Sequence, residues 1–251
     1  MADALTEPGG SVRLYVTAPL DGRVEADAAQ AHYLLHVMRA GPGDRLLLFN
    51  GRDGEWLARI AEVKKRGCVF ECERQTAPQS EVPDLWLAFA PIKKTPADYV
   101  VQKATELGVR VLQPVLTRRT IARRVNLERM RANAVEAAEQ SGRVSVPETR
   151  DLADLGKLAA AWPRERRILF CDEAGEAPSI AAALQAAPHG APSGPWAVLT
   201  GPEGGFDPAE RDMLRALPFV VPVSLGTRIL RADTAALAAL AVWQAVVGDW
   251  R

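Results

Sequence analysis

The chain has 251 residues, of which 48% are hydrophobic and 25% charged, as is usual for a soluble globular protein with room for two modest domains. Its 31 Lys and Arg residues balance 31 Asp and Glu residues, which excludes a histone-like polycation but allows a local basic patch. Three cysteines without a paired framework or a secretory signal indicate a reducing compartment. No apolar run reaches the roughly 18 residues that a membrane span needs, so we expect a cytoplasmic protein with no membrane partner.

The first part of the chain predicts a small β-barrel over residues 12–75, after a flexible extension at 1–11. Short apolar runs bounded by glycine-rich turns predict strands at 12–17, 45–49, 56–63 and 69–73. A helix is expected over 28–39, with His32 and His36 on one face. No third ligand accompanies this histidine pair, so a surface or RNA contact is expected there and no metal site. Cys68 and Cys72 share one face of a strand and are expected in the core.

A polar segment with two prolines, residues 76–83, predicts a linker, and strand–helix alternation follows over 84–251. The expected strands are 85–90, 109–116, 168–171, 196–199 and 219–223. The expected helices are 97–107, 127–141, 152–162, 180–187, 209–217 and 234–247. This alternation predicts a mostly parallel sheet with both faces covered and ligands at the carboxyl ends of its strands.

Two of these strands lead into polar, glycine-containing loops. The first loop is GPEGG (201–205), after which Asp207, Pro208 and Glu210 form a capping pattern for the next helix. The second, 225–234, reads LGTRILRADT. Taken alone, GPEGG predicts only a tight turn, but arginines beside aliphatic residues in the second loop favour a bound anion or another partner. Neither the dinucleotide-binding nor the P-loop fingerprint is present.

The strongest basic patch lies between the expected strand at 109–116 and the expected helix at 127–141. Residues 110–131 contain seven arginines and one acidic residue, with the densest cluster at 118–124. Such a run often forms only a solvated helix entry. Because acidic neighbours are missing, the cluster repels itself unless a polyanion is present, which favours a phosphate-binding surface for RNA.

Four motifs together resemble those of a known family. The segments QKATELGV (102–109), EAAEQSGR (136–143), GPEGGF (201–206) and LGTRILRADTA (225–235) occur in the order found in the SPOUT, or α/β-knot, methyltransferases. Over residues 12–251 the chain resembles the bacterial 16S ribosomal RNA (uracil-N3)-methyltransferases in particular, although that family usually has Glu where Asp233 stands. The pattern alone favours an open doubly wound sheet, whereas the resemblance implies a deep trefoil knot and a PUA-like RNA-binding barrel.

The resemblance also implies a cofactor, S-adenosyl-L-methionine, and the residues that serve it. The expected cofactor-binding residues are Leu199, Thr200, Gly201, Pro202, Glu203, Gly204, Gly205, Leu225, Gly226, Ile229 and Leu230. The expected RNA-binding residues are Arg13, His36, Arg39, Arg118, Arg119, Arg123, Arg124 and Gln140. The expected catalytic residues are Arg143, Arg228, Arg231 and Asp233.

The roles of the catalytic residues follow from the chemistry of uracil. Methylation at N3 needs loss of the imide proton and stabilisation of the resulting anion, and the three arginines suit the second task. Glu139, Glu203 and Asp233 stay open as proton acceptors, beside release of the proton to water. Arg231 has a structural alternative, an ion pair with Asp233 or another acid. Methyl donation needs no metal.

The implied substrate is a uridine of 16S ribosomal RNA, presented within the small ribosomal subunit. The apolar segment 235–247 predicts a homodimer through the C-terminal domain. Two other functions fit the same residues: a knotted 2′-O-ribose methyltransferase acting on transfer or ribosomal RNA, and a non-catalytic RNA-binding assembly factor.

Overall fold

The computed structural model describes residues 5–7, 10–65, 67–92, 95–172, 176–186 and 194–250. The contacts between residues divide the chain into two compact units. The first comprises Met1–Glu81 and Val135–Val146, and the second comprises Val82–Ala134 and Pro147–Arg251. The division at 81/82 falls within the expected linker. The segment 135–146, which we expected in the second domain, belongs with the barrel.

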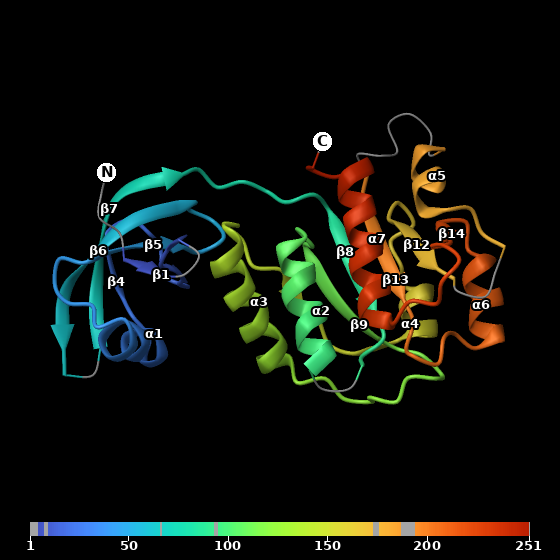
Figure 1. Cartoon of the computed structure of the whole chain (residues 1–251), viewed down its shortest axis with the longest axis horizontal. Helices are drawn as coiled ribbons and strands as arrows, with labels where there is room; N and C mark the ends of the chain where they lie inside the picture. Colours follow the sequence, from blue (N-terminus) through green and yellow to red (C-terminus); the bar gives the residue numbers. More distant parts are fainter. Residues whose placement is uncertain are drawn as a thin grey trace. The chain divides into compact units, whose positions relative to one another are not determined.

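The first unit is built on a five-stranded sheet in the order β3-β5-β6-β7-β4 (Figure 1). Its strands are β3 (Arg13–Tyr15), β4 (Arg23–Glu25), β5 (Arg45–Phe49), β6 (Glu55–Lys64) and β7 (Gly67–Ala77). One face of this sheet is buried, and β3, β5 and β7 contribute Leu14, Leu46 and Phe70 to the core that it covers. Such one-sided burial is expected because successive side chains of a strand point to opposite faces. Burial also raises the pKa of the Cys68 and Cys72 thiols, in agreement with their expected place in the core.

Part of the expected N-terminal extension is joined to this barrel. The short strands β1 (Thr6–Glu7) and β2 (Gly10–Ser11) pair antiparallel, and the backbone N–H of Leu5 donates to the carbonyl of Arg45 at 2.6 Å. Residues 1–4 and 8–9 lie outside the described residues. The described part of the extension therefore continues the barrel, because its backbone groups find partners there.

The expected helix over 28–39 is present in two parts. Helix α1 (Ala28–His32) begins with a capping box between Asp27 and Gln30, and a π-helix, η1 (Tyr33–Val37), continues it. Arg39, which follows it, has a φ of 57°, in the left-handed region that non-glycine residues seldom adopt. His36 and Arg39 are both exposed.

The C-terminal turn of helix α3 (Leu127–Ser141) is fixed to the barrel by Arg13. The guanidinium group of this arginine donates to the carbonyls of Ala138 and Glu139, both at 2.9 Å, and to that of Arg143 at 3.0 Å. Its Nε–H donates to Glu55 at 2.7 Å. Arg13 therefore satisfies carbonyls that the end of a helix leaves without intrahelical partners.

The second unit is an α/β sandwich around a parallel sheet in the order β10-β9-β8-β13-β12-β14, with β11 also paired to β9. Its strands are β8 (Leu85–Phe89), β9 (Val111–Leu116), β10 (Glu148–Thr149), β11 (Ala153–Asp154), β12 (Arg167–Cys171), β13 (Trp196–Thr200) and β14 (Val220–Val223). Its helices, besides the start of α3, are α2 (Thr95–Glu106), α4 (Leu155–Ala160), α5 (Ile180–Gln185), α6 (Pro208–Arg215) and α7 (Ala232–Val246).

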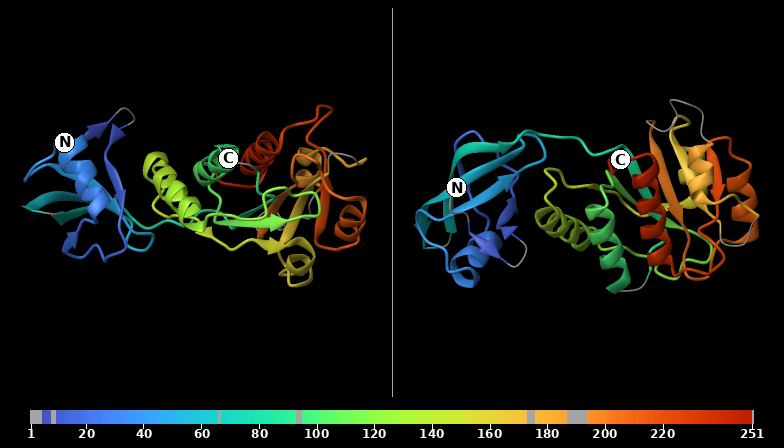
Figure 2. Two further views of the ribbon diagram at one scale, coloured as in Figure 1. Left: turned by 90° about the horizontal axis from the view of Figure 1, so that it is seen from below. Right: turned by 45° about the horizontal axis from the view of Figure 1, so that its top comes forward.

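The helices cover both faces of this sheet, as the strand–helix alternation predicts. Helix α7 packs on β13 between α2 and α5, while α4 and α6 cover the opposite face (Figures 1 and 2). All five residues of β13 are buried and four of them are apolar, as expected for a central strand that is covered on both faces. Since the paired strands are parallel, their carboxyl ends meet at one edge, where the residues that directly follow β12, β13 and β14 line one pocket.

Candidate active site

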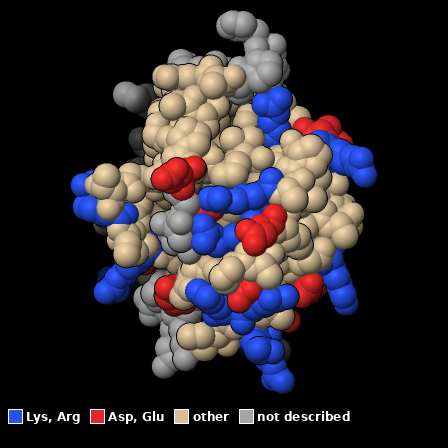
Figure 3. All heavy atoms as spheres, turned by 90° about the vertical axis from the view of Figure 1, so that its right-hand side faces the viewer, with Lys and Arg blue, Asp and Glu red and all other residues tan. Residues whose placement is uncertain are grey.

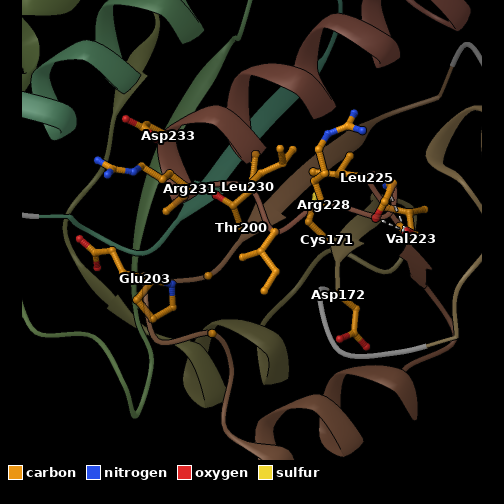
Figure 4. A pocket seen from close by; sticks show the side chains of 18 of the residues that line it. Cys171, Asp172, Thr200, Glu203, Val223, Leu225, Arg228, Leu230, Arg231 and Asp233 are labelled. Atoms are coloured by element: carbon orange, nitrogen blue, oxygen red, sulfur yellow. Dashed lines mark hydrogen bonds between the residues drawn. The ribbon is translucent and has the colours of Figure 1, made fainter.

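A pocket of about 430 Å³ opens at the carboxyl ends of β12, β13 and β14, in the place that the alternation predicts. All of its lining residues belong to the second unit. Apart from Ile92, which follows β8, they come from both glycine-containing loops, from the ends of these strands and from the first turn of α7 (Figure 4). Of the expected cofactor-binding residues, those that line it are Thr200, Gly201, Pro202, Glu203, Gly205, Leu225, Gly226, Ile229 and Leu230.

The first loop turns sharply because of two of its glycines. A Cβ at Gly201 would lie 2.7 Å from the ring of Phe206, which is buried and packs edge-on against Phe170. Gly205 has a φ of 67° and donates its N–H to the carbonyl of Pro202 at 2.9 Å. The expected capping box between Asp207 and Glu210 is present and starts α6.

Two of the expected cofactor-binding residues do not line the pocket. Gly204 is exposed, and a Cβ there would have ordinary contacts, 3.7 Å from the Cβ of Arg119. Leu199 is buried in the hydrophobic core beneath the sheet. The reason is the strand period: Leu199 and Thr200 point to opposite faces, and Thr200 is the one that lines the pocket.

The second loop brings two arginines to the pocket. Arg228 and Arg231 are exposed, and neither guanidinium group has a hydrogen-bond or ion-pair partner among the described residues. Asp233 accepts the backbone N–H of Thr234 at 2.8 Å, so the ion pair considered for Arg231 and Asp233 is not formed. Glu203, Arg231 and Asp233 lie on one side of the pocket and Arg228 on the other (Figure 4).

Asp172, a pocket residue that the sequence analysis missed, follows β12 directly. Its side chain is completely buried and accepts from Arg211 at 3.0 Å and from Arg215 at 2.6 Å, both on α6. These bonds tie α6 to the pocket wall. The expected strand at 168–171 could have identified Asp172 as a pocket residue, since the residue after a parallel strand lies at the ligand-binding edge.

The basic segment 118–124 contains two pairs of arginines that differ in their bonding. Arg118 donates to Asp207 at 2.9 Å, and Arg119 donates to the carbonyl of Gly204 at 3.0 Å, so this pair holds the first pocket loop. Arg123 and Arg124 are exposed and make no side-chain hydrogen bond or ion pair within the described part of the chain. On the face that carries α6, basic and acidic side chains are interspersed (Figure 3).

The remaining expected site residues belong to the first unit. Arg13 is only 10% exposed, and its guanidinium group is bonded to the end of α3 and to Glu55. Glu139 accepts the backbone N–H of Tyr15 at 2.9 Å. Arg143 donates to the Ser145 hydroxyl at 3.2 Å and is half-buried, and Gln140 is exposed. The EQSGR segment therefore serves in part to hold the end of α3 on the barrel.

A parallel α/β sheet with a pocket at its carboxyl edge, preceded by a small β-barrel, agrees with the expected class of RNA methyltransferases that carry a PUA-like domain. Comparison with known proteins places the chain within it. Residues 78–244 match the model of an RNA methyltransferase domain, and residues 26–72 match that of an RNA methyltransferase PUA domain.

Individual relatives agree with the family models. The chain is 30% identical to ribosomal RNA small subunit methyltransferase E of Rickettsia conorii, over 91% of this chain and 93% of that protein. It is 34% identical to the protein of the same name from a Synechocystis species, over 90% and 75%. Among solved structures, the Neisseria gonorrhoeae methyltransferase E bound to S-adenosyl methionine superposes with a TM-score of 0.85 at 30% identity, covering 96% of this chain and 99% of that one.

The chain belongs to this RNA methyltransferase family. The expected fold class is confirmed: a PUA-like barrel followed by an α/β-knot methyltransferase domain with a parallel sheet. No helix among the described residues is both long and apolar enough to span a membrane.

Proposed function

We propose that the protein transfers a methyl group from S-adenosylmethionine to N3 of a uridine in the 16S RNA of the small ribosomal subunit. The observation that carries the proposal is the pocket at the carboxyl edge, which joins a glycine-rich loop to two arginines whose guanidinium groups have no partner among the described residues. The names of its relatives support ribosomal RNA of the small subunit as the substrate.

The pocket fits the cofactor in size and in chemistry. Its volume of about 430 Å³ lies within the range of small-molecule sites. Gly201 and Gly205 bring backbone close to the pocket, Leu225 and Leu230 supply apolar contacts for an aromatic base, and Glu203 and Asp233 supply carboxylates for a positively charged ligand. When bound, the cofactor supplies an electrophilic methyl group.

The protein's own residues stabilise the nucleophile. Uracil N3 becomes a nucleophile when it loses its proton, and the negative charge spreads onto the neighbouring carbonyl oxygens. Arg228 and Arg231 stabilise this anion, because partner-free guanidinium groups in a pocket are available for charge-assisted hydrogen bonds. Asp233 and Glu203 are the carboxylates that can accept the proton, since Asp172 is buried and bonded to two arginines.

Two separate surfaces are proposed to contact RNA. The first surface is the segment between β9 and α3, where the side chains of Arg123 and Arg124 are exposed. On the barrel, His36 and Arg39 are exposed at the end of a π-helix, and Arg39 has a left-handed backbone conformation. π-helical turns and left-handed non-glycine residues cluster at functional sites, which supports a role for this end of the helix.

The active enzyme is proposed to be a cytoplasmic homodimer. The side of α7 that the described residues leave uncovered carries Ala238, Ala241, Val242 and Ala245, none of them fully buried. Since this stripe has no polar residue from Ala238 to Ala245, it is best covered by a twofold-related copy of the helix.

The decisive experiment uses labelled cofactor and small subunits from a strain that lacks this protein. We expect label in the assembled subunits, much less in naked RNA, and N3-methyluridine after nuclease digestion and nucleoside mass spectrometry. Label on a ribose 2′-oxygen would identify a 2′-O-methyltransferase instead. Absence of calorimetric binding of S-adenosylmethionine would identify a non-catalytic assembly factor.

A further inference from the structure

The pocket loop Gly201–Gly205 is held from outside by a segment more than eighty residues earlier in the chain. The backbone N–H of Arg118 donates to Glu210 at 2.8 Å, and the Arg118 side chain donates to Asp207 at 2.9 Å. Both acceptors belong to the capping box that starts α6 just after the loop. These bonds fix the base of the loop and leave its tip to another contact.

Arg119 makes that contact. Its guanidinium donates to the carbonyl of Gly204 at 3.0 Å, and its aliphatic stem lies beside Gly204, because a Cβ built there would be 3.7 Å and 3.9 Å from the Cβ and Cδ of Arg119. Gly204 itself does not line the pocket, whereas its neighbours Glu203 and Gly205 do. The arginine thus holds the back of the loop whose front faces the ligand.

We infer that Arg119 is a positioning residue for the cofactor, acting through the carbonyl of Gly204. The loop tip carries glycines at 204 and 205, and a glycine-rich segment has high conformational entropy when it is not held. Fixing it before the ligand arrives lowers the entropy that binding must remove, which increases affinity without a direct contact. The inference rests on the proposed cofactor pocket and concerns a step that needs no RNA.

The test measures binding of S-adenosylmethionine by calorimetry, with RNA absent. Arg119→Met keeps the aliphatic stem and removes the donor, so we expect the cofactor Kd to rise about 3- to 10-fold, the effect of losing one hydrogen bond of ordinary net strength. Arg119→Lys keeps a charged donor on a different geometry and should recover part of this loss. The matched control is Arg131→Met, which removes an exposed arginine from α3 and should keep the wild-type Kd.

A second measurement separates positioning from unfolding. In Arg119→Met without cofactor, the backbone amides of Gly204, Gly205 and Phe206 should exchange hydrogen faster than in the wild type, while amides of β13 keep their protection and the melting temperature is unchanged. Wild-type Kd together with wild-type exchange in the loop would overturn the inference. If the wild-type protein itself fails to bind S-adenosylmethionine, the proposed function fails instead.

Discussion

Three glycines of similar appearance in the first pocket loop have different structural roles. Gly201 has no space for a Cβ because Phe206 lies against it, Gly205 needs a positive φ, and Gly204 has space for a side chain. From the sequence, all three were expected to line the cofactor site. Only the folded loop, with Phe206 packed against Gly201 and a positive φ at Gly205, separates them.

This difference predicts unequal effects of substituting alanine for two of these glycines. Gly201→Ala should weaken binding of S-adenosylmethionine by about tenfold or more, because relieving such a close contact costs about 1–3 kcal/mol. Gly204→Ala should bind within about twofold of the wild type. Calorimetry on both variants checks this, and equal losses would show that the loop has a different conformation.

Arg13 has a structural role that its position in the sequence does not reveal. Arg13→Leu should destabilise the protein by about 2–4 kcal/mol, since it leaves Glu55, only 14% exposed, without its ion pair, and two carbonyls in the last turn of α3 and one just beyond it without their donor. Denaturant unfolding measures the change. As a control, Arg23→Leu removes an exposed arginine whose ion pair with Glu62 spans 3.9 Å and should change stability by less than about 0.5 kcal/mol.

At the scale of elements, the segment between β9 and α3 combines two tasks. A reversal of charge at Arg118 and Arg119 would disturb the pocket loop as well as any RNA contact, because the Arg119 side chain is bonded to that loop and the Arg118 side chain to the cap of α6. Arg123 and Arg124 are therefore the better test of RNA binding.

The double variant Arg123→Glu/Arg124→Glu should weaken binding to the small subunit and reduce the slope of log K against log salt by about 2, since two phosphate contacts are lost. Its cofactor affinity should be unchanged. The control Lys157→Glu/Arg164→Glu alters two exposed cations on or next to α4 and should keep the wild-type slope. An unaltered slope in the first variant would assign Arg123 and Arg124 to an ordinary solvated surface.

The apolar outer stripe of helix α7 leads us to expect a homodimer. Ala241→Glu places a charge in the middle of its outer apolar stripe, where burial against a partner would leave the carboxylate unpaired. We expect a dimeric wild type and a monomeric, folded variant by light scattering after gel filtration. Ala160→Glu, at an exposed position of α4, should stay dimeric, and a monomeric wild type would contradict the proposal.

At the scale of the whole molecule, Arg143 belongs to the first unit, whereas every residue that lines the pocket belongs to the second. We expect a site shared between subunits, in which the pocket of one subunit works with Arg143 of the other. Gly201→Ala protein mixed with Arg143→Ala protein would then form heterodimers with one intact site each.

After subunit exchange, such a mixture should recover about a quarter of the wild-type activity, because half of the dimers are mixed and one of their two sites is intact. Methyl transfer to small subunits is the measurement, and each variant mixed with itself is the control. A mixture with proven exchange and no gain in activity would exclude the shared site and leave dimerisation untouched.

Local sequence patterns predicted much of the fold. Helix α3 has the predicted bounds, β5 has the predicted bounds, and α6 begins at the predicted capping box. Each depends on residues within one or two turns of the chain, which is the range over which periodicity and capping act. The short strands β10 and β11 were missed, because two-residue strands carry no periodic signal.

The sequence by itself determined the alternation that makes a parallel sheet, the two loops that meet at its carboxyl edge and the motifs of the family. Only the tertiary structure decided that Leu199 lies in the core, that Asp172 is clamped by α6, that Arg13 caps a helix and that Arg119 holds the pocket loop. The physical reason is distance along the chain. Arg119 and Gly204 are 85 positions apart, and Arg13 and Ala138 are 125 apart, so their hydrogen bonds exist only once packing has brought them together.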